Sequence, residues 1–344
     1  MNKNPDSSSR YSRQSLLPWL GTEGQEALSR SCAAVVGLGA LGCLSASYLA
    51  RAGVGRLLLV DRDFVEESNL ARQLLYDDED CRLRLPKAVA AAQHLKAARE
   101  DLQAEARVAD LDADLAKELF ALSAVVLDGT DNFETRYLLN DAAVFSQKPW
   151  IYGGAVSTQG SVMVVRPGLT PCLRCIFPDP PPPGSAPTCD TAGILAPAAG
   201  FVASLQAGEA LKILSGRADL CPGGLLHADL LNWSFGRISA ERDPQCPACG
   251  QRRLDYLEEK AGSRTHRVCG RDGIMILAPK GTRLDLRAIK PKLEAVAPVF
   301  LNPYLLQTEW DGHPVTLYPD GRALVQKTDD PTRARTLYAR YLGI

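Results

Sequence analysis

The sequence contains no run of 18 apolar residues, the length that a membrane-spanning helix needs. Its first 14 residues are mostly polar and lack the apolar core of a signal peptide. Charge of one sign is missing as well, because 39 Lys and Arg stand against 40 Asp and Glu. The resulting net charge of -1 gives no general attraction for polyanions. We therefore expect a cytoplasmic protein with neither a membrane nor a nucleic acid as partner.

The cysteine content is well below that of a disulfide scaffold, with ten cysteines in 344 residues. Four of them form two Cys-x-x-Cys pairs, a spacing typical of metal sites in a reducing compartment. The remaining composition, with 46% hydrophobic and 23% charged residues, argues against general disorder. We expect a folded protein that binds a metal.

The length favours one large domain and a smaller one. Residues 1–10 are polar, and we expect them to be mobile. The large domain is expected over residues 11–250 and a charged linker over 251–264. A small α+β domain is expected over 265–344, where the Pro-Asp-Gly turn at 319–321 predicts a hairpin.

Apolar strand candidates alternate with helix candidates along the large domain. The predicted strands are 33–36, 56–61, 102–108, 124–128 and 150–152, and the predicted helices are 41–52, 87–99, 111–122 and 133–145. This alternation predicts a Rossmann-like, doubly wound α/β fold with a mostly parallel sheet. Strand candidates at 161–165, 225–230 and 233–238 predict an antiparallel extension, with a helix at 197–214 before the last two. Six prolines between 178 and 187 predict an extended crossover.

A glycine motif follows the first predicted strand. Gly37, Gly39 and Gly42 fit the pattern in which a tight turn brings the backbone and a helix N-terminus to a nucleotide phosphate. Asp61, nineteen residues after Gly42, can accept a hydrogen bond from a ribose hydroxyl. The pattern does not separate NAD, FAD and ATP, and a simple packing turn is the structural alternative.

Polar residues after the second predicted strand help to decide which of these nucleotides is bound. A dehydrogenase needs one acid there, but Asn69 and Arg72 also follow, and both can reach phosphates. Lys87 lies in the first turn of a helix behind Pro86, where a cation is disfavoured unless it serves an anion. A solvated surface lysine is the alternative.

Asp131 and Asn132 follow the strand 124–128, at the edge where open α/β sheets bind ligands. An acid at this edge can hold magnesium. Helix capping is the alternative, because both residue types are favoured N-caps.

Cys172, Cys175, Cys246 and Cys249 supply four thiolates, enough for a closed zinc site of the structural kind. The 70 residues between the two pairs exceed the spacing of a simple zinc ribbon. Cys189 lies on a polar segment after the prolines, where it is accessible enough to react, although an inert loop cysteine fits equally well.

Together these motifs resemble the MoeB/ThiF/HesA family, bacterial relatives of ubiquitin-activating enzymes. The resemblance rests on residues 10–14, the glycine motif, residues 68–73, Lys87, residues 128–132 and the two Cys-x-x-Cys pairs, in that order. It spans about residues 10–250. It departs at Ala40, where the family often has glycine, and in the slightly long segment 76–86.

The resemblance implies ATP-dependent adenylation of the C-terminal glycine of a ubiquitin-like sulfur carrier protein ending in Gly-Gly. The carrier would be ThiS-like or MoaD-like and would serve thiamine or molybdopterin biosynthesis. ATP, magnesium and zinc are the implied cofactors, and a homodimer and a cysteine desulfurase are further implied partners. Arg13 would reach the neighbouring protomer's site, and Cys189 would form a covalent link to the carrier. The residues implied to bind nucleotide or magnesium are Gly37, Gly39, Ala40, Gly42, Asp61, Asp63, Ser68, Asn69, Arg72, Lys87, Asp131 and Asn132.

Other activities stay open at this point. A relative could activate a different carboxylate or a tRNA substrate, and a catalytically silent partner would keep only its ATP affinity. A zinc-containing NAD or FAD oxidoreductase would share the glycine motif but has no use for Arg13, Arg72 and Lys87. Cys269 could suggest a rhodanese domain, but residues 265–344 are too few and the cysteine lies at their beginning. We assign no role to this small domain.

Overall fold

The computed structural model describes residues 10–181, 187–258, 265–267, 273–278 and 281–342. The chain forms two compact units, residues 1–260 and 261–344, and each has its own core. Most of the segment 1–10, the end of the segment 251–264, part of the proline-rich stretch and Cys269 lie outside the described residues.

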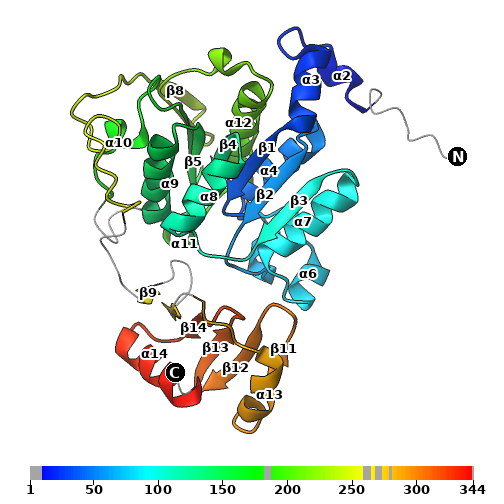
Figure 1. The fold of residues 1–344 in the computed structure, drawn as a ribbon, viewed down its shortest axis with the longest axis vertical. Helices are drawn as coiled ribbons and strands as arrows, with labels where there is room; N and C mark the ends of the chain where they lie inside the picture. Colours follow the sequence, from blue (N-terminus) through cyan, green and yellow to red (C-terminus); the bar gives the residue numbers. More distant parts are fainter. Residues whose placement is uncertain (1–9, 182–186, 259–264, 268–272, 279–280, 343–344) are drawn as a thin grey trace, which may run out of the picture. The chain divides into compact units, whose positions relative to one another are not determined.

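The first unit is built on an eight-stranded sheet in the order β3-β2-β1-β4-β5-β6-β7-β8 (Figure 1). The strands are β1 (Cys32–Val36), β2 (Arg56–Val60), β3 (Gln103–Arg107), β4 (Val125–Asp128), β5 (Trp150–Val156), β6 (Gln159–Val165), β7 (Leu225–Asp229) and β8 (Ser234–Ile238). The first five are parallel, and the last three extend the sheet antiparallel. The strand order reverses between β1 and β4, and such a switch point is where open α/β sheets bind ligands.

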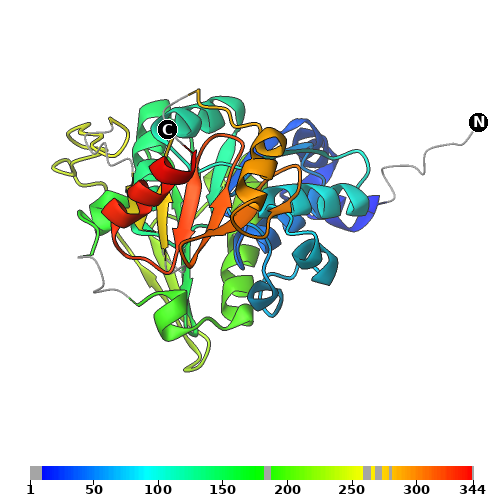
Figure 2. The same ribbon diagram turned by 90° about the horizontal axis from the view of Figure 1, so that it is seen from below.

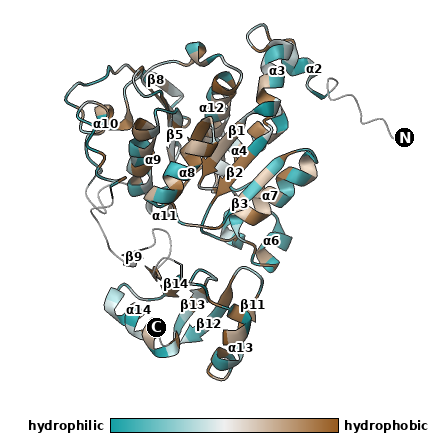
Figure 3. Cartoon of the chain, viewed as in Figure 1, coloured by the Kyte–Doolittle hydropathy of each residue, from teal (hydrophilic) through white to brown (hydrophobic). Residues whose placement is uncertain are grey.

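Alternate residues of the central strands face two separate cores. Ala33 and Val35 of β1 belong to one core, whereas Ala34 and Val36 belong to the other. The central strands are therefore hydrophobic on both faces and largely brown in Figure 3, as expected for parallel strands covered by helices on both sides.

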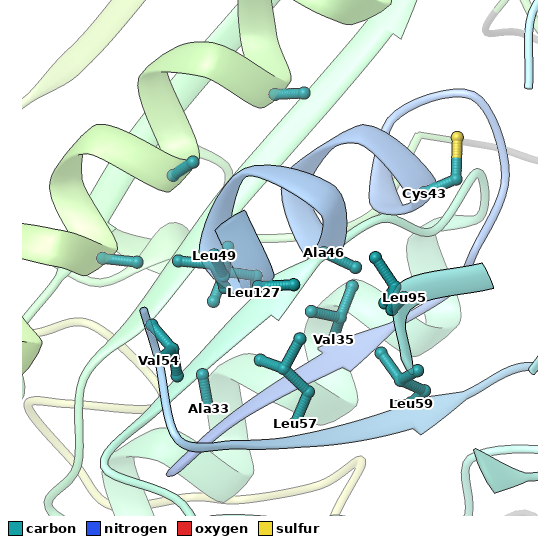
Figure 4. Packing of buried hydrophobic residues seen from close by; sticks show 14 of the residues in the cluster. Ala33, Val35, Cys43, Ala46, Leu49, Val54, Leu57, Leu59, Leu95 and Leu127 are labelled. Atoms are coloured by element: carbon teal, nitrogen blue, oxygen red, sulfur yellow. The ribbon is translucent and has the colours of Figure 1, made fainter. Parts of the chain in front are cut away.

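Helices of the first unit divide between the two faces. Those of the first core are α3 (Gly21–Arg30), α4 (Gly42–Ala52), α7 (Lys87–Ala98) and α12 (Ala196–Leu214), and those of the second are α8 (Ala113–Leu122) and α9 (Phe133–Ser146). Figure 4 shows side chains of α4 and α7 gathered around those of β1 and β2, among them Ala46, Leu49, Leu95, Val35, Leu57 and Leu59. The predicted Rossmann-like fold with an antiparallel extension is confirmed.

Short helices complete the first unit and were not anticipated from the sequence. They are α2 (Ser12–Ser15), α5 (Glu67–Leu70), α6 (Asp78–Arg82), α10 (Leu173–Ile176), α11 (Cys189–Ala192) and a 3-10 turn at Ala218–Leu220. Helices this short lack the apolar periodicity by which longer ones are predicted. Among the described residues, no helix has both the length and the apolar character needed to cross a bilayer.

The second unit has a six-stranded antiparallel sheet in the order β11-β12-β13-β14-β10-β9. The strands are β9 (Thr265–Arg267), β10 (Gly273–Ile276), β11 (Phe300–Leu301), β12 (Leu306–Trp310), β13 (His313–Leu317) and β14 (Ala323–Gln326). The helices α13 (Leu286–Glu294) and α14 (Pro331–Leu342), orange and red in Figure 2, share one core with this sheet. β13 and β14 pair around the turn at 319–321, so the predicted hairpin is confirmed.

Candidate functional site

Three glycines pack against one another where β1 and β4 end. Gly37 has a φ of +82°, and a Cβ there would lie 2.7 Å from the backbone of Gly129. A Cβ on Gly42 would lie 1.8 Å from the Gly37 carbonyl oxygen. Packing of the protein itself therefore requires glycine at these positions. Gly39 differs, because within the described part of the chain, its chain neighbours aside, the one heavy atom within 4 Å of a Cβ there is Gln73 Nε2, at 3.9 Å. The space beside Gly39 can admit a ligand to the backbone at the start of α4.

Asp61 follows β2 and fixes two backbone amides. Its Oδ2 accepts a hydrogen bond from Leu38 N, within the glycine motif, and its Oδ1 accepts one from Asp63 N, both at 2.7 Å. Burial raises the pKa of Asp61, and the charge of Lys87 opposes that rise. Each carboxylate oxygen has a second lone pair, so Asp61 can also accept from a ligand hydroxyl beside the glycine motif.

Lys87 is the first residue of α7 and is only 7% exposed. Its backbone N–H donates to the Asp63 carbonyl at 2.8 Å, and its Nζ lies 3.9 Å from Asp63 Oδ2. The alternative of a solvated lysine is therefore wrong. The ammonium group faces a carboxylate that is itself partly exposed, and at a helix N-terminus it is well placed to neutralise an anionic ligand.

The turn that contains α5 carries the next polar groups. Asn69 is buried, with its Oδ1 accepting from Glu66 N at 3.3 Å and its Nδ2 donating to Ser68 Oγ at 3.4 Å. Arg72 is partly exposed and donates to the Ser68 carbonyl at 2.6 Å. A guanidinium has five N–H donors, so this bond orients Arg72 and leaves donors for an anion.

The loop after β4 carries Asp131 and Asn132, and their two side chains have different environments. Asn132 caps α9, because its Oδ1 accepts from Thr135 N at 2.9 Å. The side chain of Asp131 is exposed at the carboxyl end of the sheet. Capping therefore accounts for the Asn132 oxygen, and Asp131 retains a carboxylate with which it can bind a cation.

A buried ion pair supports this loop. Asp128 is fully buried, and its Oδ1 accepts from both the N–H and the hydroxyl of Thr130, at 2.9 and 2.7 Å. Its Oδ2 lies 3.5 Å from Arg136 Nε, and Arg136 also donates to the Thr130 carbonyl at 2.8 Å. Burial lowers the pKa of Arg136, but Tyr152, Asp128, Asp131 and Cys189 together raise it above its usual range. Arg136 therefore holds the loop before Asp131 to the end of β4.

Cys189 is the first residue of α11 and is partly buried. Its Sγ lies 3.6 Å from the Ala155 carbonyl at the end of β5. The segment after α11 is attached to the β5–β6 turn by hydrogen bonds from Ser157 N to Gly193 O and from Leu195 N to Ser157 O, both at 2.8 Å. Cys189 is thus held beside the same end of the sheet as the residues after β4.

Arg13 is the one predicted site residue that the fold keeps apart from the others. It is exposed on α2, and its neighbour Gln14 donates to the carbonyl of Ala52 at 2.8 Å. Ala52 ends α4, whereas the glycine motif precedes that helix, so about 16 Å of helix lies between them. Arg13 would have to act on another copy of the chain.

The four predicted zinc ligands come together. The Sγ atoms of Cys172 and Cys246 are 3.5 Å apart, those of Cys175 and Cys249 are 3.3 Å apart, and all four lie within 4.8 Å of one another. Sulfurs about 2.3 Å from a tetrahedral ion would be about 3.8 Å apart. The cluster therefore fits a zinc ion and would tie the start of the crossover to the segment after β8.

Asp141 on α9 is buried, and this burial raises its pKa to about 6. Because folding favours the neutral acid, this group makes the protein less stable as the pH rises from about 4 to 6. An Asp141→Asn variant keeps an oxygen that can accept from Tyr256 N, now bonded to Asp141 Oδ2 at 3.1 Å. We expect the variant to gain up to about 3 kcal/mol over the parent at pH 7.5 and nothing at pH 4. Urea unfolding of both proteins at the two pH values measures this, and equal stabilities at pH 7.5 would contradict it.

The profile of the ThiF family matches residues 11–248. The chain belongs to the ThiF family. This membership confirms the resemblance predicted from the sequence and covers the β1–α4 glycine motif, the Lys87 and Asp131 segments and the cysteines Cys172, Cys175 and Cys246, whereas Cys249 lies one residue beyond the matched region.

Relatives of this ThiF-family chain carry consistent names. It is 39% identical to the sulfur carrier protein ThiS adenylyltransferase of Bacillus subtilis over 97% of this chain and 99% of that protein. It is 42% identical to a sulfur carrier protein adenylyltransferase of Thermus thermophilus over 74% of this chain and 97% of that protein. The match to the B. subtilis protein includes the second unit of this chain. The match to the T. thermophilus protein covers three quarters of this chain and nearly all of that protein.

Solved structures show the same fold. The crystal structure of E. coli MccB with MccA-N7isoASN superposes with a TM-score of 0.61 at 20% identity, over 72% of this chain and 76% of that chain. The crystal structure of PaaA gives 0.57 at 22% identity, over 70% of this chain and 85% of that chain.

Sequence reasoning missed three buried residues that hold the site of this ThiF-family chain. The Tyr76 hydroxyl donates to Leu38 O at 2.8 Å and lies 3.4 Å from Lys87 O, so it joins the glycine motif to α7. Gln206 on α12 donates to Asp128 O and Ile151 O at 2.8 and 2.9 Å. Arg136 pairs with Asp128 as described above. A polar residue on the apolar face of a helix was the available signal for Gln206 and Arg136, whereas Tyr76 lies in an irregular segment with no periodicity.

Proposed function

We propose that the chain is an adenylyltransferase that uses ATP to adenylylate the C-terminal glycine of a ubiquitin-like sulfur carrier protein, for thiamine or molybdopterin biosynthesis. The observation that carries the proposal is the meeting of an open glycine turn, the Asp61 carboxylate and the buried Lys87 ammonium at the switch point of the sheet. Its family and the names of its relatives support the substrate class. The B. subtilis relative, which also spans the second unit, favours a ThiS-like carrier.

The reaction joins two anions. An oxygen of the carrier's terminal carboxylate bonds to the α-phosphorus, and the bond from that phosphorus to the bridging oxygen breaks, its electron pair leaving with pyrophosphate. The carboxylate is already ionised at neutral pH, so no general base is needed. Repulsion between the reactants is the obstacle, and cations that face the phosphates lower it.

Each residue of the site has a place in this reaction. Asp61 accepts from the ribose hydroxyls, with Asp63 beside it, and the phosphates run past the backbone of Gly39 and Ala40. Asn69, Arg72 and Lys87 bind the phosphates, with Ser68 orienting Arg72 through its carbonyl. The departing pyrophosphate gains charge during the reaction, so the cations stabilise the transition state more than bound ATP.

Asp131 is the proposed magnesium ligand, with Asn132 next to it. An exposed carboxylate is a hard oxygen donor of the kind that magnesium prefers, and the ion would neutralise phosphate charge. The four-cysteine cluster would hold zinc with no open position, so its proposed role is structural.

A protein substrate is supported by an apolar surface at the edge of the first sheet. Leu231, Trp233 and Phe235, on β8 and the turn before it, are 72%, 84% and 51% exposed. This turn is hydrogen-bonded to the β5–β6 turn, from Leu230 N to Thr158 O at 3.0 Å, and that turn in turn holds the segment after Cys189. A carrier docked on this edge could pass its C-terminal tail along the crossover to the phosphates.

Two further partners belong to the proposal. Arg13 is supplied to the site of a neighbouring protomer, so the enzyme is a homodimer, and a cysteine desulfurase provides the sulfur. The Cys189 thiolate then attacks the carbonyl carbon of the carrier's acyl-adenylate, so that a thioester forms and AMP leaves with the electron pair of the broken C–O bond. A carrier–enzyme adduct that is absent from a Cys189→Ala variant is the expected sign, and adduct formation by that variant would contradict this role.

ATP–pyrophosphate exchange tests the function directly. Purified protein incubated with ATP, magnesium and labelled pyrophosphate is expected to form labelled ATP only when a Gly-Gly carrier is present. Arg72→Ala and Asp131→Ala are each expected to lower the exchange rate about 100-fold, because each removes charge stabilisation in the transition state. Arg82→Ala is the matched control, since Arg82 is exposed on α6 and pairs with its helical neighbour Glu79. Exchange without a carrier would point to another substrate, and undiminished exchange in both site variants would refute the site.

A further inference from the structure

The side chain of Gln73 is buried beside the glycine turn, and its amide group makes no hydrogen bond to the residues that the structure describes. It is 3% exposed and its Oε1 is buried with no hydrogen-bond partner, whereas its Nε2 is not one of the buried unpaired atoms and donates to no group in the described part of the chain. Buried side-chain amides are nearly always hydrogen-bonded, and leaving one unpaired costs stability. An anion cannot complete the Oε1 acceptor, so this atom remains a cost in stability, whereas the N–H groups of Nε2 are donors that a ligand beside the glycine turn can use.

The backbone around Gln73 is held on both sides, so its position is not accidental. Its N–H donates to Asn69 O at 2.8 Å, and its carbonyl accepts from Tyr76 N at 3.2 Å. Tyr76 in turn is bonded to Leu38 of the glycine motif. The turn that carries Gln73 is thus attached to the loop that it faces.

The amide points to the one open place of the glycine motif. Among the described residues, leaving aside the chain neighbours of Gly39, Gln73 Nε2 is the only heavy atom within 4 Å of a Cβ built on Gly39. Leu38, the residue before Gly39, donates to Asp61, the proposed ribose acceptor. The phosphate that lies next to Gly39 is therefore the one attached to the ribose, which is the α-phosphate.

We propose that Gln73 is a catalytic residue whose Nε2 donates a hydrogen bond to a nonbridging oxygen of the α-phosphate during adenylation. This inference rests on the proposed function. When the carboxylate oxygen bonds to the α-phosphorus, negative charge grows on the nonbridging oxygens, and it is relieved when pyrophosphate departs with the electron pair. A neutral donor stabilises that charge without transferring a proton and without holding the anionic product as tightly as a cation would.

The test replaces Gln73 with Met, which has a similar length and no polar amide. We expect the kcat of carrier-dependent exchange to fall by about 10- to 100-fold, with a change in KM for ATP of less than about threefold. The melting temperature should stay unchanged or rise, because no protein hydrogen bond is lost. Gln73→Glu should be slower than Gln73→Met, because it places a negative charge beside the reacting phosphate.

Gln206 is the matched control for a structural amide. It is also fully buried, but its Nε2 bonds to Asp128 O and Ile151 O and its Oε1 accepts from Ser45 Oγ at 3.1 Å. Gln206→Met is therefore expected to lower the melting temperature by several degrees, the opposite of Gln73→Met. A Gln73→Met enzyme with the parent's kcat, or one that loses melting temperature as Gln206→Met does, would overturn the assignment. Absence of exchange in the parent protein would instead refute the proposed function.

Discussion

Replacing Lys87 by Met is expected to lower ATP–pyrophosphate exchange about 1000-fold while the protein stays folded. Lys87 is the buried cation of the site, so its charge acts on the phosphates with little screening by water. A 1000-fold loss corresponds to about 4 kcal/mol of transition-state stabilisation. Met keeps the apolar stem, and the Asp63 carboxylate left behind is 29% exposed and can be hydrated.

The measurement is the exchange rate at saturating ATP and carrier, together with the melting temperature. Lys96→Met is the matched control, because Lys96 lies on the same helix but is exposed. Its exchange rate should equal that of the parent. Exchange by Lys87→Met within tenfold of the parent would show that Lys87 does not serve the phosphates.

The same variant tests the proposed dimer. If Arg13 acts on the neighbouring protomer, a mixture of Arg13→Ala and Lys87→Met chains forms mixed dimers in which one site has both native residues. Exchange should then recover to roughly a quarter of the parent rate, since half of the dimers are mixed and each has one intact site. A mixture no more active than its components would argue against a site shared between protomers.

Two glycines of the same motif are expected to respond in opposite ways to substitution by alanine. Gly42→Ala would force its Cβ to within 1.8 Å of the Gly37 carbonyl, and Gly37 is itself packed against the backbone of Gly129. Because both neighbours are backbone, the overlap cannot be relieved by a side-chain rotation, and we expect a loss of stability of at least about 3 kcal/mol. Gly39→Ala meets no backbone, so it should melt close to the parent temperature.

Nucleotide binding separates the two glycines further. Alanine at position 39 would place a methyl group in the space where the phosphate approaches the backbone, so we expect ATP affinity to fall about 100-fold in a fully folded protein. Calorimetric ATP titration and thermal melting of Gly39→Ala, Gly42→Ala and the parent test both expectations. A Gly39→Ala protein that binds ATP like the parent would show that the phosphate does not lie at Gly39.

Prediction from the sequence succeeded where one segment determines the outcome. The glycine motif, the strands on either side of it and the long helices are set by local steric and hydrophobic patterns, so the order of elements and the fold class could be predicted. The position of Lys87 at the first turn of α7 could be predicted for the same reason, since Pro86 favours a helix start. The short helices α5, α6 and α11 could not, because a single turn has no periodicity.

The burial and hydrogen bonding of individual side chains could not be predicted from the sequence. From the sequence alone, Lys87 at a helix N-terminus could equally be a solvated lysine. It is buried because Asp63 and the adjoining turn pack against it. In the sequence, Gln73 is one polar residue within a polar segment. Its Oε1 is buried without a partner because the turn packs over it.

The amino-acid sequence by itself determined which chemical groups this ThiF-family chain can offer and on which elements most of them lie, because residue type and local pattern are properties of short segments. The tertiary structure alone decided which groups meet. It brought cysteines 74 residues apart to within 3.5 Å, set Asp61 against Leu38, and kept Arg13 away from its own chain's site. The physical reason is that burial and distance depend on contacts between segments far apart along the chain, and those contacts carry no local signature.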